Sequence, residues 1–286
     1  MPSAVGSAVA SGGSARSRIV DACVYEPSLR SSLGLSLSSH DQQTESARHE
    51  ASEERVHVGG AIEAMDRAGV RAALVVLDQE VEEFLRVRAR QPRRLYGWAH
   101  YDSLRPERGL ETVRALCEGH AEAFVGVATA FPCFGQDPRL KAFVPFYEYC
   151  MQRELPVLFR SDGGPHARAS ARPLAVGVLA TVYPRLRVVC LQENADEGDE
   201  TTGLLAQFPN LFLAANPGTI RGDSPNLRAR VRTVGSRKIM FASGGRETGV
   251  PYDKSVAALS RLAWWHRANI GWRTATRVFG PRIWES

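Results

Sequence analysis

Charged residues in this sequence stand directly after short apolar runs, where a strand would end and its side chains could meet a ligand. Arg160 and Asp162 follow one run, and Glu193 follows the next. The planar fork of an arginine suits a carboxylate, so Arg160 is a candidate for binding a carboxylated small molecule. Asp162 or Glu193 could then act as a general base if burial raised the pKa of its carboxyl group.

The same charges also allow a structural interpretation, which we favour. Arg160 can pair with the neighbouring acids and hold this part of the fold together without any turnover. Residues 161–164 read SDGG, which is a turn signal, so Asp162 can serve the turn alone.

Five further candidates for ligand binding also lie in or just after apolar runs. Cys23 and Tyr25 alternate within IVDACVY, so both could point into one pocket. A nucleophilic thiol needs a nearby base or helix terminus, and no histidine obviously reaches Cys23, so we expect a buried small side chain. The others are Gln192, Ser243 and Arg246, the last of which could bind an anion.

The elements that position these residues are short β-branched runs alternating with amphipathic segments. We expect strands at 19–24, 72–77, 95–100, 123–128, 156–160, 186–191, 210–214 and 238–242. Amphipathic helical stretches are expected at 58–68, 106–117, 140–153 and 172–183. In the third of these, helical spacing predicts a buried face made of Phe143, Phe146, Tyr147 and Cys150.

Eight strands alternating with helices predict a single-domain α/β protein with the (β/α)₈ TIM-barrel fold. The alternative is a doubly wound sheet, which would place a Gly-rich turn after its first strand, and the chain has CVYEPS there. We expect the barrel over residues 19–286, a disordered Ser/Gly/Ala-rich tail at 1–18 and a mobile polar loop at 28–55.

Composition excludes several classes of protein. The longest apolar stretch is about ten residues, against the roughly 20 that a membrane span needs, and the N-terminus does not read as a secretory signal. Five cysteines without close spacing indicate free, mostly buried thiols in a reducing compartment, so we expect a cytoplasmic protein. The net charge is +5, but arginines are spread along the chain among acids, which argues against a nucleic-acid partner.

Several motifs, in this order, resemble the amidohydrolase-related family of metal-dependent hydrolases, from about Ile19 to Gly280. They are IVDACVY, AMDRAGVRAALVV, YEYCMQRELPVLFRSDGG, FPNLFLAAN, KIMFASGG and TATRVFG. The resemblance implies a barrel whose strand ends hold zinc or a similar ion, with histidines on the first, fifth and sixth strands and an aspartate on the eighth.

At those positions this chain has other residues: Cys23, Tyr25, Arg160, Gln192 and Gly244. A guanidinium cannot ligate a cation, and glutamine and glycine supply no strong anionic ligand. Only the Cys23 thiolate could ligate strongly, and one ligand does not make a zinc site. Because of these departures from the family pattern, we expect a barrel without a bound metal or other cofactor.

Three interpretations of the function follow. We expect a non-catalytic partner or a ligand-binding subunit. It would associate with a related barrel that keeps its ligands, or with copies of itself. The alternative is a metal-independent hydrolase or decarboxylase, with Arg160 or Arg246 holding a carboxylate and Asp162 or Glu193 handling the proton. In the third interpretation the metal ligands lie at other positions of the chain, and His100 and His166 could reach the pocket.

Overall fold

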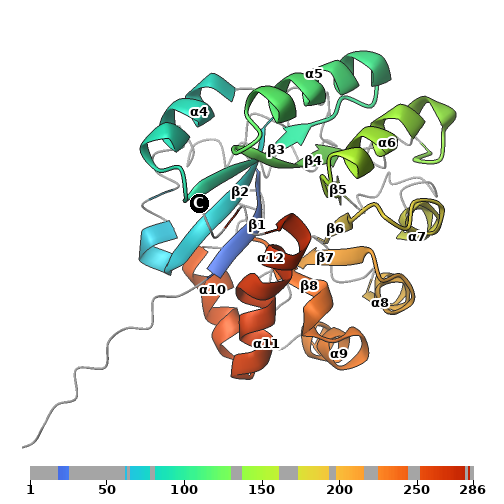
Figure 1. The fold of residues 1–286 in the computed structure, drawn as a ribbon. Coiled ribbons are helices and arrows are strands. Elements are labelled where there is room, and N and C mark those ends of the chain that lie inside the picture. The colour runs from blue at the N-terminus through green and yellow to red at the C-terminus, as the bar shows by residue number, and fades with distance from the viewer. Residues whose placement is uncertain are drawn as a thin grey trace, which may run out of the picture.

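A computed structural model describes residues 19–25, 62, 65–77, 81–129, 137–160, 173–192, 198–215, 225–243, 252–280 and 283. Its strands form one parallel sheet in sequential order (Figure 1). They are β1 Ile19–Tyr25, β2 Val70–Leu77, β3 Leu95–His100, β4 Phe124–Thr129, β5 Val157–Arg160, β6 Val188–Gln192, β7 Leu211–Ala215 and β8 Ile239–Phe241. Strands such as VRAALVVL are nearly continuous apolar runs because both of their faces are buried.

The sheet curls so that its first and last strands, β1 and β8, contact each other. A doubly wound sheet would change direction in its strand order, whereas here each strand pairs with the next. The predicted (β/α)₈ barrel is therefore confirmed, and the doubly wound alternative is wrong.

Helices lie around the outside of the barrel, and the last of them packs against the apolar cluster inside it (Figure 1). They are α4 Val81–Arg90, α5 Pro106–Gly119, α6 Val144–Gln152, α7 Pro173–Val182, α8 Gly198–Gln207, α9 Pro225–Val234, α10 Tyr252–Ser260, α11 Trp264–Ala268 and α12 Thr274–Phe279. Short 3-10 turns lie at Lys141–Phe143 and Ser236–Lys238, and a π-helical turn at Asn269–Arg273 joins α11 to α12. The stretch predicted as one helix at 140–153 is thus a 3-10 turn followed by α6, which begins with a proline in its first turn.

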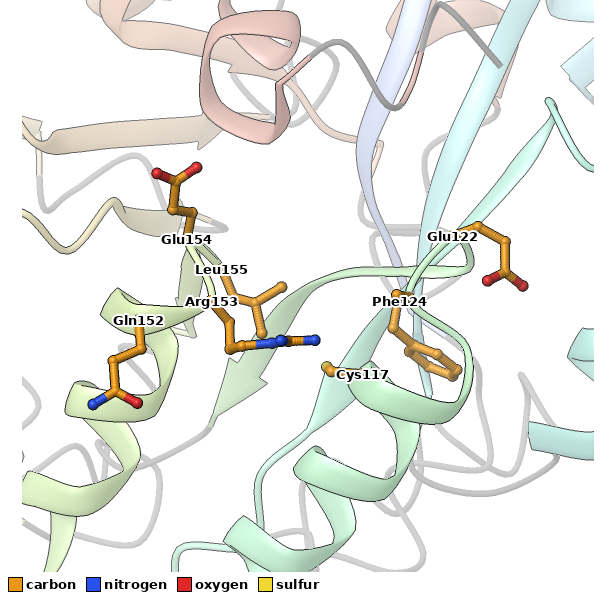
Figure 2. A pocket seen from close by; sticks show the side chains of 8 residues that line it. Cys117, Glu122, Phe124, Gln152, Arg153, Glu154 and Leu155 are labelled. Carbon is orange, nitrogen blue, oxygen red and sulfur yellow. The ribbon is translucent and has the colours of Figure 1, made fainter.

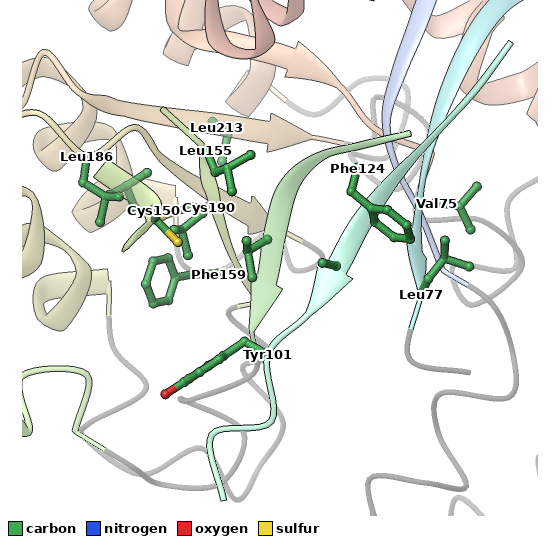
Figure 3. Close-up of a cluster of buried hydrophobic side chains, with 14 of the residues drawn as sticks. Val75, Leu77, Tyr101, Phe124, Cys150, Leu155, Phe159, Leu186, Cys190 and Leu213 are labelled. Carbon is green, nitrogen blue, oxygen red and sulfur yellow. The ribbon is translucent and has the colours of Figure 1, made fainter. Parts of the chain in front are cut away.

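The apolar core has two layers, one inside the barrel and one between the sheet and the helices. Inside, Trp98 meets the ring of Phe279 from α12 edge to face, with ring centroids 5.1 Å apart. Outside, Tyr101 stacks on Phe146 at 4.0 Å, within the cluster that Figure 3 draws in part. Each fully buried aromatic side chain contributes about 1.5–3 kcal/mol of hydrophobic stabilisation.

Several further expectations can be compared with this core. Phe143, Phe146, Tyr147 and Cys150 are all buried, as predicted. The four described cysteines are buried free thiols, and Cys133 lies outside the described residues. The expected tail at 1–18 and loop at 28–55 lie outside them too. Among the helices that the structure describes, none has the length and apolar character needed to cross a membrane.

Candidate functional site

The predicted site residues stand at the C-terminal ends of the strands. Cys23 lies in β1 and Tyr25 ends it, Arg160 ends β5 and Gln192 ends β6. Ser243 follows the end of β8 by two residues. Because all eight strands are parallel, these backbone positions share one end of the barrel, where βα barrels carry their chemistry. The structure thus brings five of the candidates to one mouth.

The other candidates fall outside the described part of the chain. These are the proposed acids Asp162 and Glu193, the anion-binding candidate Arg246, and Gly244 and His166. Their roles remain predictions.

Asp21, in β1, makes the best-defined polar contacts near this mouth, and the sequence analysis did not single it out. Its side chain is 0% exposed. Its Oδ1 accepts the backbone N–H of Cys23 at 3.2 Å and that of Ser243 at 2.9 Å. One carboxylate oxygen therefore ties the first strand to the segment that follows the last strand. The sequence signal that could have identified Asp21 is its position as the only carboxylate in the apolar run IVDACVY. A buried carboxylate needs hydrogen-bond partners, so such a residue is expected to make structural contacts.

Trp98, in β3, also holds β1 in place. Its indole Nε1–H donates to the backbone carbonyl of Ala22 at 2.9 Å, across the inside of the barrel. The register of β1 against β2 shifts between Asp21 and Val24, which is the sign of a bulge. Asp21 and Trp98 thus fix the irregular backbone at Ala22 and Cys23.

Cys23 itself is 0% exposed and belongs to the apolar cluster inside the barrel. This position fits the expectation of a buried small side chain better than that of an exposed nucleophile, since a reactive thiol needs access and a polar, electropositive surrounding.

A metal ion does not fit those residues at this mouth that belong to the described ranges. Cys23 is the only strong donor among the five strand-end positions, and its side chain packs in an apolar cluster. Asp21 brings a carboxylate close to Cys23 and Ser243, but its Oδ1 already accepts two backbone N–H groups. Arg160 and Gln192 cannot replace histidine ligands, because a guanidinium is a cation and an amide is a weak ligand.

The displaced metal site considered above would need His100. This residue ends β3, and its alternation with Tyr96 and Trp98 places it on the inner side of the strand. Within the described ranges, no three His, Cys, Asp or Glu side chains gather closely enough to hold a metal ion.

A cavity of about 580 Å³ opens at the other end of the barrel (Figure 2). Its floor includes Cys117 of α5, Phe124 at the start of β4 and Leu155 just before β5. Arg153 and Glu122 contribute charged groups to its lining. The cavity lies at the N-terminal ends of β4 and β5, so it is remote from the strand ends where the sequence places the site. We give the strand ends more weight, because barrel chemistry occurs at that face.

The buried thiol of this cavity makes stability sensitive to alkaline pH. Burial raises the pKa of Cys117 to about 12 from an ordinary 9.0, and the nearby Arg153 guanidinium offsets this only in part. The unfolded chain therefore ionises this thiol first as pH rises. We expect a free energy of unfolding that holds below pH 9 and falls above it, by at least about 1 kcal/mol at pH ~10.5.

Urea unfolding followed at pH ~8 and pH ~10.5 checks this expectation. Cys117→Ala should lower stability at both values but show a smaller loss between them, because the group that titrates is gone. Equal losses in the two proteins would contradict the assignment of this effect to Cys117.

Comparison with known proteins places this geometry among barrels of similar shape. The sequence matches no protein-family profile and no curated protein. A TIM-barrel protein of Bordetella bronchiseptica superposes with a TM-score of 0.71 at 14% identity, over 93% of this chain and 99% of that one.

Two enzymes are also similar in structure. A dihydroxybenzoic acid decarboxylase of Polaromonas, with bound manganese and the inhibitor 2-nitroresorcinol, has a TM-score of 0.61 at 14% identity, over 92% of this chain and 97% of that chain. A 4-oxalomesaconate hydratase of Rhodopseudomonas palustris has a TM-score of 0.64 at 14% identity, over 93% and 96%. At these identities the likeness establishes the fold alone, so this chain is a (β/α)₈ barrel, as predicted from the sequence.

Proposed function

We propose that this protein is a metal-independent barrel of the amidohydrolase type that binds a carboxylated small molecule and acts as a non-catalytic subunit. The observation that supports it is the set of residues at the strand ends. Cys23, Tyr25, Arg160 and Gln192 stand in or at the ends of the strands where the family's ligands are expected, and residues of these types do not together make a zinc site.

Arg160 gives this proposal its ligand class. In a metal-dependent barrel a divalent cation supplies the positive charge at the mouth. Here a guanidinium at the end of β5 would supply it, and two parallel N–H···O bonds would orient a carboxylate. The ligand would be an organic acid small enough to enter the mouth.

A second candidate is a metal-independent decarboxylase. The similar structures favour it, since one of them decarboxylates dihydroxybenzoic acid. In this case the C–C bond to the carboxylate breaks, carbon dioxide leaves, and a proton from Asp162 or Glu193 replaces it on carbon. We do not extend the manganese of that enzyme to this chain, because the positions where the resemblance expects ligands carry Cys23, Tyr25, Arg160, Gln192 and Gly244.

Benzoate and 2,6-dihydroxybenzoate are suitable probes, with binding measured by calorimetry and turnover by release of carbon dioxide. We expect binding without turnover, and Arg160→Gln should weaken it about tenfold or more, since a charged hydrogen bond contributes about 1.5–3 kcal/mol. Arg153→Gln is the matched control, because Arg153 is exposed and stands before β5, at the other end of the barrel.

Three outcomes separate the candidates. If Asp162→Asn and Glu193→Gln leave binding unchanged and no carbon dioxide is released, the subunit proposal holds. Turnover that these changes abolish supports the decarboxylase. Near-stoichiometric zinc or manganese in freshly purified protein would overturn both and show that ligands lie elsewhere in the chain.

A further inference from the structure

The positive charge of this protein is concentrated in its C-terminal part. Residues 225–286 contain twelve lysines and arginines against three acids, a net charge of +9. The whole chain carries +5, so the preceding 224 residues carry −4. This distribution differs from the even spread that the sequence analysis assumed.

The fold brings described elements that carry several of these cations together on one side of the barrel. The turn Ser236–Lys238 contacts α9 and the π-helical turn, which in turn contacts α11 and α12. These elements lie together in Figure 1, next to α10. Their exposed cations include Arg232, Arg237, Arg267, Arg273 and Arg277.

These five arginines have no acidic partners in the part of the chain that the structure describes. Asp253 of α10 is the only acid within 225–243 and 252–280. Arg277 instead donates to the carbonyl of Arg237 at 3.0 Å. Burial, and next the repulsion by Arg277, lower the pKa of Lys238.

Two exposed tryptophans lie on the same helical segment. Trp264 is 64% exposed and Trp265 is 50% exposed, and their rings meet edge to face at 5.8 Å. The other large exposed apolar side chains among the described residues, Leu104, Leu140 and Val182, lie elsewhere in the chain. From Trp264 to Arg277 the helical segment extends about 20 Å at 1.5 Å per residue.

We propose that this arginine–tryptophan face, formed by the five arginines and the two tryptophans named above, binds single-stranded nucleic acid. Arginine forks bind phosphate oxygens, and exposed indole rings stack on unpaired bases of any sequence. Proteins that bind single strands without sequence preference combine cationic side chains, which contact the phosphates, with aromatic rings, on which the bases stack.

The composition of the face favours this ligand over three alternatives: a protein partner, a membrane surface and a nucleic-acid duplex. The buried centre of a protein–protein interface is depleted of charge, whereas charge dominates here. A membrane-bound helix buries a continuous apolar face in the lipid, and this segment exposes only two large apolar side chains. A duplex offers phosphates but keeps its bases stacked, so it would leave the tryptophans unused.

Fluorescence anisotropy with labelled oligouridine and oligodeoxythymidine of about 16 nucleotides tests the proposal. We expect binding at ~50 mM salt that is tighter than binding to a duplex of equal length and weakens steeply at ~200 mM. The tighter of the two single strands identifies RNA or DNA as the ligand. Intrinsic tryptophan fluorescence should be quenched by the unlabelled strand.

Variants separate stacking from simple charge attraction. Trp264→Ala with Trp265→Ala should weaken binding about tenfold or more at constant salt, since stacking contributes about 1–3 kcal/mol per base. Arg273→Gln with Arg277→Gln should reduce the slope of log affinity against log salt by about 1.4, because each phosphate contact accounts for about 0.7. The matched control is Arg86→Gln with Arg90→Gln, which are exposed on α4 at the same spacing of four residues.

Three results would overturn the proposal. One is the absence of binding at ~50 mM salt. A second is equal affinity for duplex and single strand with no effect of the tryptophan changes, which would leave a non-specific charge attraction. The third is association with vesicles of anionic lipid that exceeds association with the oligonucleotides. None of these results depends on the barrel mouth, so they leave the proposed function untouched.

Discussion

Replacing Asp21 by alanine should lower the free energy of unfolding by about 3 kcal/mol, one of the largest effects expected in this chain. The backbone N–H groups of Cys23 and Ser243 would both lose their acceptor in a fully buried place. Each buried donor left without a partner costs about 1–3 kcal/mol, since water cannot replace the lost bond. Urea unfolding followed by circular dichroism measures the loss.

Two other substitutions show whether the loss comes from these hydrogen bonds. Asp21→Asn keeps an oxygen acceptor in the same place, so it should cost clearly less than alanine. Asp66→Ala removes a carboxylate from an exposed ion pair with Arg94 and should cost less than about 1 kcal/mol. If the free energy of unfolding of Asp21→Ala lay within ~0.5 kcal/mol of the wild-type value, the carboxylate would not hold the two strands together.

Asp21 also has a consequence for the proposed function. Its hydrogen bonds fix the backbone beside Cys23 and Ser243, two of the candidate ligand-binding residues. A protein that merely keeps its fold would tolerate a less ordered mouth, whereas a binding site needs its groups held in place by a supporting set of contacts. Asp21→Asn should therefore weaken benzoate binding even where it leaves most of the stability.

The sequence predicted the strands well for a simple physical reason. Parallel strands covered on both sides are short runs of β-branched and apolar residues, and such runs are conspicuous between polar loops. Each expected strand overlaps the observed one, and the ends differ by at most two residues. Sequential order then followed from alternation with helices, because parallel neighbours need a crossover connection.

The site was predicted less completely, because its main contacts join residues far apart in the chain. Arg160 and Gln192 could be located, since they end strands that the pattern identifies. The bond from Ser243 to Asp21 joins residues 222 positions apart, and no local pattern announces it. The clustering of arginines is likewise a result of folding. Folding brings α9 against the turn before β8, and it brings that turn against the helical segment after α10.

Replacing Trp98 by alanine should have the other large effect, a loss of about 3–5 kcal/mol. The side chain is fully buried inside the barrel, so its removal leaves a cavity and frees the carbonyl of Ala22 from its indole partner. Trp98→Phe keeps most of the packing but not the N–H donor, so it should cost less. The difference between the two variants measures the packing part of the loss.

Gly126 provides an independent test of how tightly the barrel interior fits around Trp98. A Cβ at position 126 would lie 2.4 Å from Cζ3 of the Trp98 ring and 3.1 Å from the Pro156 carbonyl oxygen, so only the first contact depends on the indole. Gly126→Ala alone should be strongly destabilising, by about 1–3 kcal/mol. In the Trp98→Ala background the same change should cost much less, because the new methyl group enters the vacated space. The coupling energy from this double-mutant cycle should therefore exceed ~1 kcal/mol. Additive losses would instead show that Gly126 is required by the Pro156 carbonyl and that the ring has room to move, in which case Trp98 would not fix the backbone beside Cys23.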